Sequence, residues 1–411
     1  MGITTNRQPP ARLLDLTRSL SRAGRQPTGI DRVELAYLDH LLHDDIPLFG
    51  LLRTGAGYLL LDREGLSAAQ TRLHGTEPWG EADLLSSMFR KRPEMVRRAE
   101  SDLRALAIGR CRPRGLAQML RRHLPAGAGY INTGHAGLNL RALGAIRNGT
   151  GGPIAVLVHD TIPLDHPDYQ RPGTVERFRR KLAAVEEMAD LVICNSRFTE
   201  TRLRETLAHC PETIVAPLGV TPAQPDPLLL PEGLPPARPY FVTVGTIEPR
   251  KGHDLLLDVW DSLCATRPGE EIPGLLICGA RGWNNAEVFA RLDALPPDGP
   301  VKELRGLPDG AIAALLQGSC GLLFPSHAEG YGLPPLEAAS LGVPVVLRDL
   351  PVYRETLGNI PVYQNETDCY LWRNIVDQLS AVKQGHDRNS KVPRFAAPGW
   401  SDHFDVVGNR I

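Results

Sequence analysis

Two glutamates, Glu329 and Glu337, stand eight positions apart and flank a glycine-rich turn. The apolar run 321–325 before the turn predicts a buried strand, and the prolines after it predict the start of a helix. A turn of this kind directs free backbone N–H groups and the positive end of a helix dipole at one point, which favours an anion. Carboxylates beside that point can accept hydrogen bonds from hydroxyls. The pattern therefore predicts a site for a nucleotide-sugar.

Two basic residues follow a second predicted strand, 240–245. Arg250 and Lys251 stand there at the start of a predicted helix, where the helix dipole disfavours cations. A bound diphosphate explains the pair better, because its negative charge grows as the bond to the sugar breaks and both cations can neutralise it. The alternative is a pair of surface cations near a helix end.

These patterns resemble the E-x7-E signature and the basic motif of retaining GT-B glycosyltransferases of family 4, also called glycosyl transferases group 1. The resemblance covers most of the chain. His159-Asp160 after the strand 154–158 resembles the family's N-domain histidine motif, and Gly29 lies where the family has its N-terminal glycine loop. Each motif follows the carboxyl end of a predicted strand, where ligands bind in doubly wound sheets.

The resemblance implies an α/β fold of the GT-B type, with two doubly wound, Rossmann-like parallel-sheet domains facing each other across a cleft. It also implies transfer of a hexose such as mannose, with retention, from a nucleotide-diphosphate sugar. The acceptor would be a glycan or a lipid-linked glycan in cell-surface polysaccharide synthesis. A front-face reaction, in which the leaving phosphate helps to deprotonate the acceptor, is the family's default.

Roles for single residues follow from the same resemblance. The catalytic set would be Lys251, Arg250, Glu329 and His159. The donor would contact Gly29, Gly245, Thr246, Trp283, Gly306, Leu307, Gly330, Tyr331, Gly332, Leu333 and Glu337. Glu337 would bind the ribose, the backbone at 331–333 the distal phosphate, and Trp283 the nucleobase. The acceptor side would include His135 and Asp160. The chain departs from the family at Thr246, where similar enzymes often carry an arginine, and at position 29, where one glycine replaces a pair.

Several alternatives stay open at this point. His159 could be a strand-end histidine bonded to a neighbouring loop, and Trp283 could serve loop packing alone. The chain could be a GT-B sugar-nucleotide epimerase or phosphorylase, which differs from a transferase in whether an acceptor is needed for release of the nucleotide diphosphate. It could also be a non-catalytic scaffold that binds nucleotide or glycan, although binding alone does not require the set Lys251, Glu329 and Glu337.

Composition limits the class of protein. A chain of 411 residues favours two domains, and a net charge of −1 gives no general attraction to nucleic acid. The seven cysteines are scattered without metal-binding spacing, which predicts small buried thiols and a reducing cytoplasm. No paired carboxylates with metal spacing occur, so we expect neither metal nor cofactor. The N-terminus lacks an apolar signal core, and no apolar window is long enough to span a bilayer.

Strands and helices alternate along the chain, as expected of βαβ units and parallel sheets. Apolar runs predict strands at 12–16, 129–133, 154–158, 191–195, 213–218, 240–245, 274–279, 301–306, 321–326, 344–349 and 360–364. Helices are expected at 30–43, 174–189, 197–208, 252–267, 309–319, 334–342 and 366–382. The expected domains are 1–220 on the acceptor side, a proline-rich linker at 221–239, a nucleotide-sugar domain at 240–385, and a tail with a crossover helix at 386–411.

Residues 90–122 carry an excess of eight positive charges. We expect this segment to face anionic lipid headgroups or a lipid-diphosphate acceptor, which would make the protein a peripheral enzyme at the inner membrane. The alternative is a solvated helical hairpin. Near the C-terminus, Trp400, Phe404 and Val407 have helical spacing and predict a short helix with one apolar side.

Overall fold

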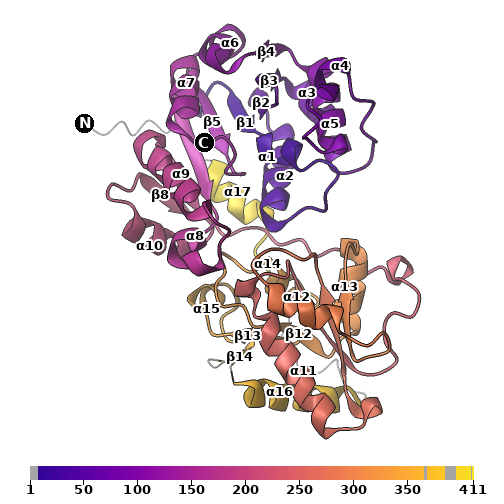
Figure 1. The fold of residues 1–411 in the computed structure, drawn as a ribbon. Coiled ribbons are helices and arrows are strands. Elements are labelled where there is room, and N and C mark those ends of the chain that lie inside the picture. The colour runs from indigo at the N-terminus through magenta and orange to yellow at the C-terminus, as the bar shows by residue number, and fades with distance from the viewer. Residues whose placement is uncertain (1–7, 365–367, 385–394, 409) are drawn as a thin grey trace. The chain divides into compact units, whose positions relative to one another are not determined.

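The computed structural model describes residues 8–364, 368–384, 395–408 and 410–411, which form two compact units (Figure 1). The first unit contains the chain up to His159 together with Glu176–Leu218 and Trp400–Ile411. The second contains Asp160–Val175 and Gly219–Gly399. Each unit is an α/β structure built on one mainly parallel sheet, which confirms the predicted fold class.

An eight-stranded sheet organises the first unit, in the order β4-β3-β2-β1-β5-β6-β7-β8. Its strands are β1 (Arg12–Asp15), β2 (Leu48–Arg53), β3 (Tyr58–Leu61), β4 (Gly109–Cys111), β5 (Ala128–Asn132), β6 (Gly151–Val158), β7 (Leu191–Cys194) and β8 (Glu212–Val215). All neighbours are parallel except β2–β3 and β3–β4. The sequence predicted β1 and β5–β8 but missed β2–β4.

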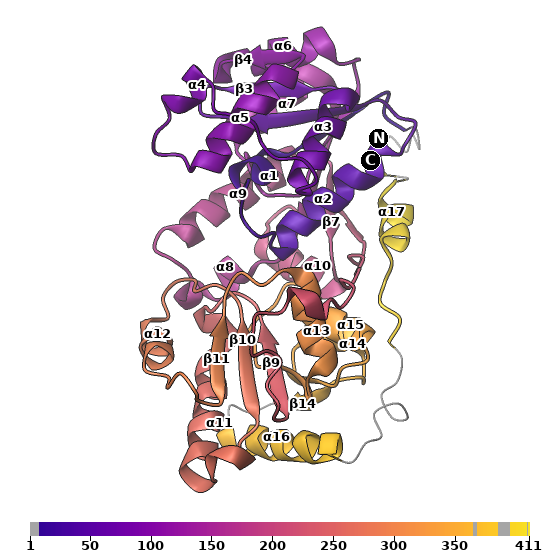
Figure 2. The same ribbon diagram turned by 90° about the vertical axis from the view of Figure 1, so that its right-hand side faces the viewer.

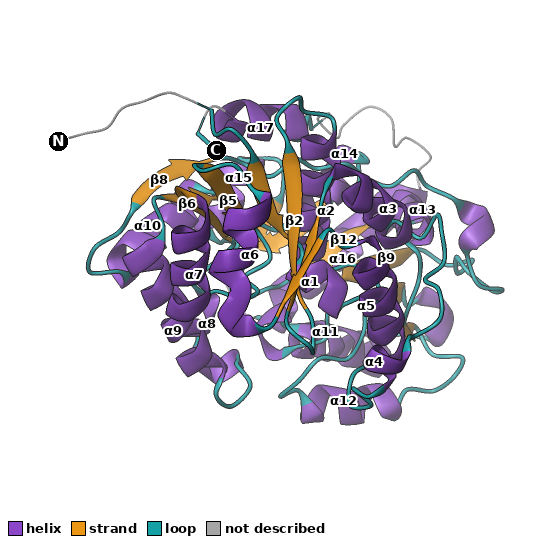
Figure 3. Cartoon of the chain, turned by 90° about the horizontal axis from the view of Figure 1, so that it is seen from above, coloured by secondary structure: helices purple, strands orange, loops and turns teal. Residues whose placement is uncertain are grey.

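Helices lie on both sides of this sheet (Figure 3). They are α1 (Thr17–Ser21), α2 (Gly29–Leu42), α3 (Arg63–Leu73), α4 (Leu84–Ser87), α5 (Glu94–Leu106), α6 (Leu116–His123), α7 (Leu140–Thr150), α9 (Thr174–Met188), α10 (Arg197–Thr206) and α17 (Trp400–Gly408). The C-terminal helix α17 was expected to have one apolar side, and Phe404 and Val407 are indeed buried, with Trp400 stacked on Phe404. Part of the expected tail, 386–394, lies outside the described residues.

A six-stranded, fully parallel sheet organises the second unit, in the order β11-β10-β9-β12-β13-β14 (Figure 2). Its strands are β9 (Tyr240–Val244), β10 (Gly274–Cys278), β11 (Val301–Leu304), β12 (Gly321–Phe324), β13 (Val345–Arg348) and β14 (Val362–Gln364). The helices are α8 (Ile162–Asp165), α11 (His253–Thr266), α12 (Ala286–Asp293), α13 (Asp309–Gly318), α14 (Leu333–Ser340), α15 (Pro351–Leu357) and α16 (Cys369–Gln384). All six strands were predicted. The four central ones, β10, β9, β12 and β13, are almost fully buried, and strands buried on both faces appear in a sequence as continuous apolar runs.

The strand order of the second sheet places a candidate site. The chain proceeds from β9 outward through β10 to β11, and then returns to the other side of β9 to form β12. β9 and β12 are therefore neighbours, and the chain runs on from them in opposite directions along the sheet, from β9 to β10 and from β12 to β13. Such a reversal opens a crevice at the carboxyl ends of the strands, where doubly wound sheets bind their ligands.

Two further segments differ from simple expectation. The proline-rich stretch includes a short 3-10 turn, Pro227–Leu229, which packs on α13 within the second unit. The basic segment 90–122 is not a helical hairpin, because the strand β4 lies between α5 and α6 and pairs with β3. The thiols of Cys194, Cys278 and Cys320 are buried as expected, but Cys264 is exposed and the other three cysteines, Cys111, Cys210 and Cys369, are partly exposed. None of the helices in the described part of the chain is both long and apolar enough to cross a bilayer.

Candidate active site

The loops after β9 and β12 are fastened together at the point where the strand order reverses. After β9 the chain forms a 3-10 turn at Pro249–Lys251, and Gly252 then takes a positive φ of 66° before α11 begins. A Cβ on Gly252 would lie 2.6 Å from the carbonyl oxygen of Pro325, so only glycine allows this close approach. The backbone N–H of His327 donates to the carbonyl of Arg250 at 2.7 Å. The two loops thus present their side chains to one place.

Three predicted catalytic residues meet there. The Nζ atom of Lys251 donates to Oε1 of Glu329 at 2.5 Å, and Nη1 of Arg250 lies 2.9 Å from the same oxygen. The guanidinium of Arg250 also bonds Glu248, with Nε 2.7 Å from Oε1. Lys251 and Glu329 are 9% and 8% exposed. The formal charges of the two cations and the two glutamates cancel, which offsets part of the free-energy cost of burying them.

Burial and ion pairing act against each other in this cluster. Burial alone would raise the pKa of Glu329, but Arg250 and Lys251 outweigh it and hold the pKa at about 2. Burial lowers the pKa of Lys251, and the charge of Glu329 offsets part of that change. The Nζ atom of Lys251 also lies 4.4 Å from the centre of the Phe324 ring. Glu329 is therefore ionised at neutral pH and positions both cations.

Asp160 belongs to the same surroundings, although the sequence paired it with His159. It lies in the second unit and interacts electrostatically with Arg250 and Glu329. Burial raises its pKa to about 6, while Arg250 opposes that rise. One of its oxygens accepts from the backbone N–H of Ile162 at 3.1 Å. Asp160 is thus a carboxyl group whose charge changes just below neutral pH, next to the basic pair.

The start of α14 has the geometry that an anion site needs. Gly332 has a φ of 90° and precedes the first helical residue, Leu333, while Tyr331 is buried and Gly330 is half-buried. A Cβ on Gly332 would lie 2.5 Å from Cε1 of Tyr353. Glu337 is the fifth residue of the helix and is half-exposed. Pro334 and Pro335 have no N–H, and the N–H of Leu336 donates to the carbonyl of Gly332 at 3.4 Å. A backbone contact with a phosphate at this helix N-terminus would therefore come from Leu333 and the turn before it, and it stays a prediction.

Replacing Gly332 by alanine is expected to weaken both the fold and nucleotide binding, because the new Cβ strains the backbone and displaces Tyr353. Gly342, at the other end of α14, has a similar φ of 71° with nothing within 4 Å of its Cβ position, which makes Gly342→Ala a matched control. The control should lose only roughly 1–2 kcal/mol of folding stability, which is the cost of placing a non-glycine residue in the left-handed conformation. Thermal unfolding and calorimetric titration with nucleoside diphosphates would compare them. Equal effects of the two changes would show that the Tyr353 contact does not matter.

Residues expected around the nucleobase follow the strands β9, β10 and β11. Trp283 donates from Nε1 to the carbonyl of Tyr169 at 2.9 Å, and the Arg171 guanidinium lies 4.7 Å from its ring centre. These contacts are the loop packing that the sequence left open as an alternative. Gly306 turns the chain after β11 with a φ of 69°, and Leu307 beyond it is buried. Base recognition here stays a prediction.

The remaining residues after β9 also lie at this edge. Gly245 lies beside the basic pair, because a Cβ there would be 3.6 Å from Nζ of Lys251. Thr246 follows directly and packs against the loop after β10, where a Cβ on Gly282 would meet its methyl group at 2.7 Å.

Three predicted residues lie in the first unit. His159 is buried and its Nε2 donates to the carbonyl of Thr133 at 2.7 Å, while burial lowers its pKa to about 4. His135 contacts the carbonyl of Leu157 through Nε2 at 2.8 Å, and the two imidazole centres are 5.1 Å apart. Gly29 is exposed and begins α2. The structure thus places both histidines as neutral side chains at the ends of β5 and β6, His159 bonded to the loop after β5 and His135 to the backbone of β6.

Sequence reasoning missed two residues of the second-unit site. Glu248 is 3% exposed and forms an ion pair with Arg250. Its position two residues before that arginine is the one feature of the sequence that could have pointed to this pair. His253 opens α11 with 2% exposure, and neither of its ring nitrogens has a hydrogen-bond partner. Burial lowers the pKa of His253 to about 3, so it is uncharged. Nothing in the sequence marked this histidine as buried.

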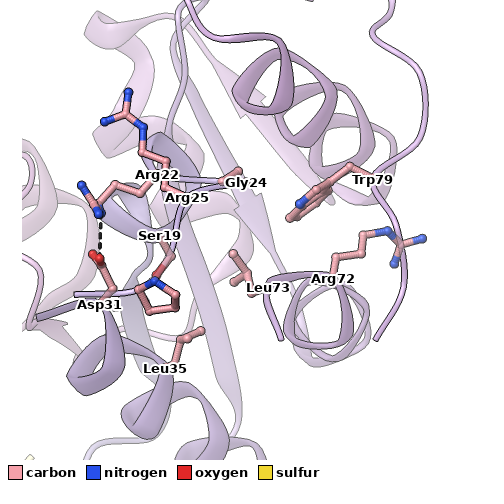
Figure 4. A pocket seen from close by; sticks show the side chains of 11 residues that line it. Ser19, Arg22, Gly24, Arg25, Asp31, Leu35, Arg72, Leu73 and Trp79 are labelled. Atoms are coloured by element: carbon pink, nitrogen blue, oxygen red, sulfur yellow. Dashed lines mark hydrogen bonds and ion pairs between the residues drawn. The ribbon is translucent and has the colours of Figure 1, made fainter. Parts of the chain in front are cut away.

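A pocket opens in the first unit beside α1, the start of α2 and the end of α3 (Figure 4). Arg22 on one side is bonded to Asp31, with Nε 2.7 Å from Oδ2, and Trp79 and Leu73 form the other side. The lining residues are Ser19, Arg22, Ala23, Gly24, Arg25, Pro27, Asp31, Leu35, Arg72, Leu73 and Trp79.

Comparison with known proteins gives the family context of the site. Residues 231–360 match the family model of glycosyl transferases group 1, which covers β9 to α15 and so both loops of the charged cluster. The chain is 31% identical over 255 residues to the serotype-specific mannosyltransferase WbdA of Escherichia coli. That alignment covers 57% of this chain and 31% of the relative, so the chain spans about a third of the relative's length.

Two further similarities agree with this one. The O-antigen chain mannosyltransferase B of Escherichia coli is 26% identical over 230 residues, covering 54% of this chain and 58% of that protein. Among solved structures, Anabaena Alr3699/HepE in complex with UDP-glucose aligns with a TM-score of 0.61 at 18% identity, over 97% of this chain and 96% of the other. The structural likeness shows the fold, which is GT-B.

Proposed function

Because residues 231–360 match the family model of glycosyl transferases group 1, we propose that this protein moves a hexose from a nucleotide-diphosphate sugar to a glycan or lipid-linked acceptor, with retention. The acceptor would be a growing cell-surface polysaccharide, and mannose is the favoured sugar because the similar curated proteins are named mannosyltransferases. The observation that carries the proposal is the meeting of Lys251 and Arg250 on Glu329 at the reversal point of the second sheet.

The chemistry asked of this cluster is charge stabilisation. The bond between the sugar's anomeric carbon and the diphosphate oxygen breaks, and the acceptor oxygen bonds to that carbon on the same face. The acceptor's proton passes to the departing phosphate oxygen, so no separate base is needed. Lys251, Arg250 and the backbone N–H groups at 331–333 would stabilise the charge that develops on the diphosphate. Glu329 would hold both cations in place before the donor arrives.

One assay separates this proposal from its alternatives. The protein is offered GDP-, UDP-, ADP- and dTDP-sugars, and nucleoside diphosphate is measured with and without a glycan acceptor. Release that needs the acceptor supports a transferase. Donor turnover without an acceptor supports an epimerase or phosphorylase. Donor binding with no turnover under either condition supports a scaffold, and both of the last two results would overturn the proposal.

Activity is expected to survive EDTA. Within the described residues no group of three or more His, Cys, Asp or Glu side chains could hold a metal ion, and the basic pair supplies the charge that Mg²⁺ supplies in other transferases. The measurement is the initial rate after EDTA treatment and again after addition of Mg²⁺ or Mn²⁺. A loss of activity that either metal restores would show that the leaving diphosphate is neutralised by a metal ion.

The proposed place of action is the cytoplasmic face of the inner membrane. Seven free cysteines suit a reducing compartment, and a lipid-linked acceptor would lie at a membrane surface. Not every cation of the segment 90–122 is available to attract anionic lipid, because some of them are already paired with carboxylates. Arg92, Arg98 and Arg104 form ion pairs with Glu100, Glu81 and Asp83, respectively. The remaining exposed cations would have to provide the attraction.

A further inference from the structure

Three large apolar side chains project from the first unit within five residues of each other. Leu84 is 90% exposed, Leu85 40% and Met88 77%. Single exposed apolar residues are common on protein surfaces, but a cluster of large ones usually marks a contact surface. We call these three side chains, on and just after the short helix α4, the apolar tip.

The apolar tip is held in a defined position by polar contacts beneath it. Asp83 caps α4 by accepting from the backbone N–H of Ser86 at 2.6 Å. Arg104 reaches from α5 to the carboxylate of Asp83 at 2.5 Å and to the hydroxyl of Ser86 at 3.0 Å. Arg104 is 6% exposed and Ser86 is fully buried. A buried arginine thus anchors the turn from below while the apolar side chains point to solvent.

Cations without acidic partners flank the apolar tip. Arg90 and Lys91 follow it directly, are exposed, and have no ion-pair partner within the described ranges. Arg110, Arg112 and Arg114, in and after β4, are likewise exposed and have no such partner in the described chain. In two views a quarter turn apart, α4 and β4 lie along the same upper edge of the first unit (Figures 1 and 2).

We propose that the apolar tip and its flanking cations dock the first unit on an anionic lipid bilayer. Leu84, Leu85 and Met88 enter the boundary between headgroups and acyl chains, and Arg90 and Lys91 contact headgroup phosphates. Apolar insertion and basic attraction together are the two signals that give a peripheral protein stable binding. The charge favours lipid over a second copy of the chain, because two such edges would repel. The inference deepens the proposed function, since a lipid-linked acceptor lies in such a surface.

The test compares vesicles of phosphatidylcholine with vesicles containing about a third phosphatidylglycerol, by co-sedimentation at low and moderate salt. The wild type should bind the anionic vesicles, and more weakly in salt. The Leu84→Ser/Met88→Ser variant should lose about tenfold or more of that binding. Arg90→Gln/Lys91→Gln should lose mainly the salt-sensitive part. Leu228→Ser is the matched control, because Leu228 is 93% exposed in the second unit and should bind as the wild type does.

Three results would overturn the inference: no binding of the wild type to anionic vesicles at low salt, unchanged binding of the Leu84→Ser/Met88→Ser variant, or a change in oligomeric state in place of vesicle binding. The last would show that another copy covers the apolar tip. Transfer to a soluble glycan is measured in parallel. Transfer to the soluble glycan without vesicle binding would contradict the docking surface but not the proposed function. Vesicle binding without donor turnover would contradict the proposed function but not the docking surface.

Discussion

Lys251→Ala is expected to lower turnover at saturating donor by about 10²–10³-fold, which corresponds to about 2.7–4 kcal/mol of transition-state stabilisation. The reason is that the negative charge on the leaving diphosphate grows during the reaction, so a fixed cation stabilises the transition state more than the bound donor. Turnover should therefore fall at least as strongly as donor affinity. The measurement is kcat at saturating donor, together with the Kd of the nucleoside diphosphate.

A second lysine of the same unit provides the control. Lys302 is partly exposed in β11, away from the charged cluster, and Lys302→Ala should leave both kcat and Kd close to those of the wild type. Thermal unfolding of both variants shows whether the fold is retained, since Lys251 is buried and bonded to Glu329. Unchanged turnover of Lys251→Ala at saturating donor would remove this residue from the mechanism.

Glu329→Gln is expected to cost about 3 kcal/mol of folding stability at neutral pH. The native cluster lowers the pKa of Glu329 from 4.5 to about 2, because Arg250 and Lys251 favour its charged form more than burial opposes it. A depressed pKa stabilises the folded state fully at pH values above the unfolded pKa. That contribution is then lost as the pH falls from 4.5 toward about 2, where the folded carboxylate is protonated as well.

Denaturant unfolding of wild type and variant across the acid range would check this dependence. The difference in unfolding free energy should be largest near neutral pH and should shrink below about pH 4.5. Glu232→Gln, at an exposed position in the second unit, should show almost no difference at any pH. If Glu329→Gln destabilises the protein equally at neutral and acid pH, the ion pairs do not account for the stability that Glu329 provides.

Much of the second unit was predictable because its four central strands are buried on both faces. The run Tyr240–Val244 is apolar except for Thr243, as expected for a parallel strand covered by helices on either side. In the first unit, β2 and β3 were missed because short leucine-rich runs without alternation do not distinguish a strand from a helix. The three-residue β4 carried no apolar signal at all.

The sequence predicted that Lys251, Arg250 and Glu329 lie near each other, but it missed Glu248 and His253 and did not predict how the side chains are arranged. The position of Lys251 after one strand and of Glu329 after another was enough to bring them to the same edge of a parallel sheet. Their direct bond was not foreseen, because it joins residues 78 positions apart and depends on how Gly252 packs on the end of β12. The location of Asp160 was also missed. His159 belongs to the first unit, but Asp160 belongs to the second, where it interacts with residues far away in the sequence.

The segment Asp160–Val175 gives this protein an interleaved chain rather than two consecutive modules. The chain passes from one unit to the other four times, at 159–160, 175–176, 218–219 and 399–400. A fragment beginning at residue 219 would lack Tyr169 and Gln170, whose carbonyls accept from Trp283 and Asn284. A chimera of two relatives joined within the proline-rich stretch would have the same defect. Its loop after β10 would come from one parent, and the segment 160–175 that this loop contacts would come from the other. A second unit transplanted between relatives would therefore keep these two contacts only if the segment 160–175 came from the same parent.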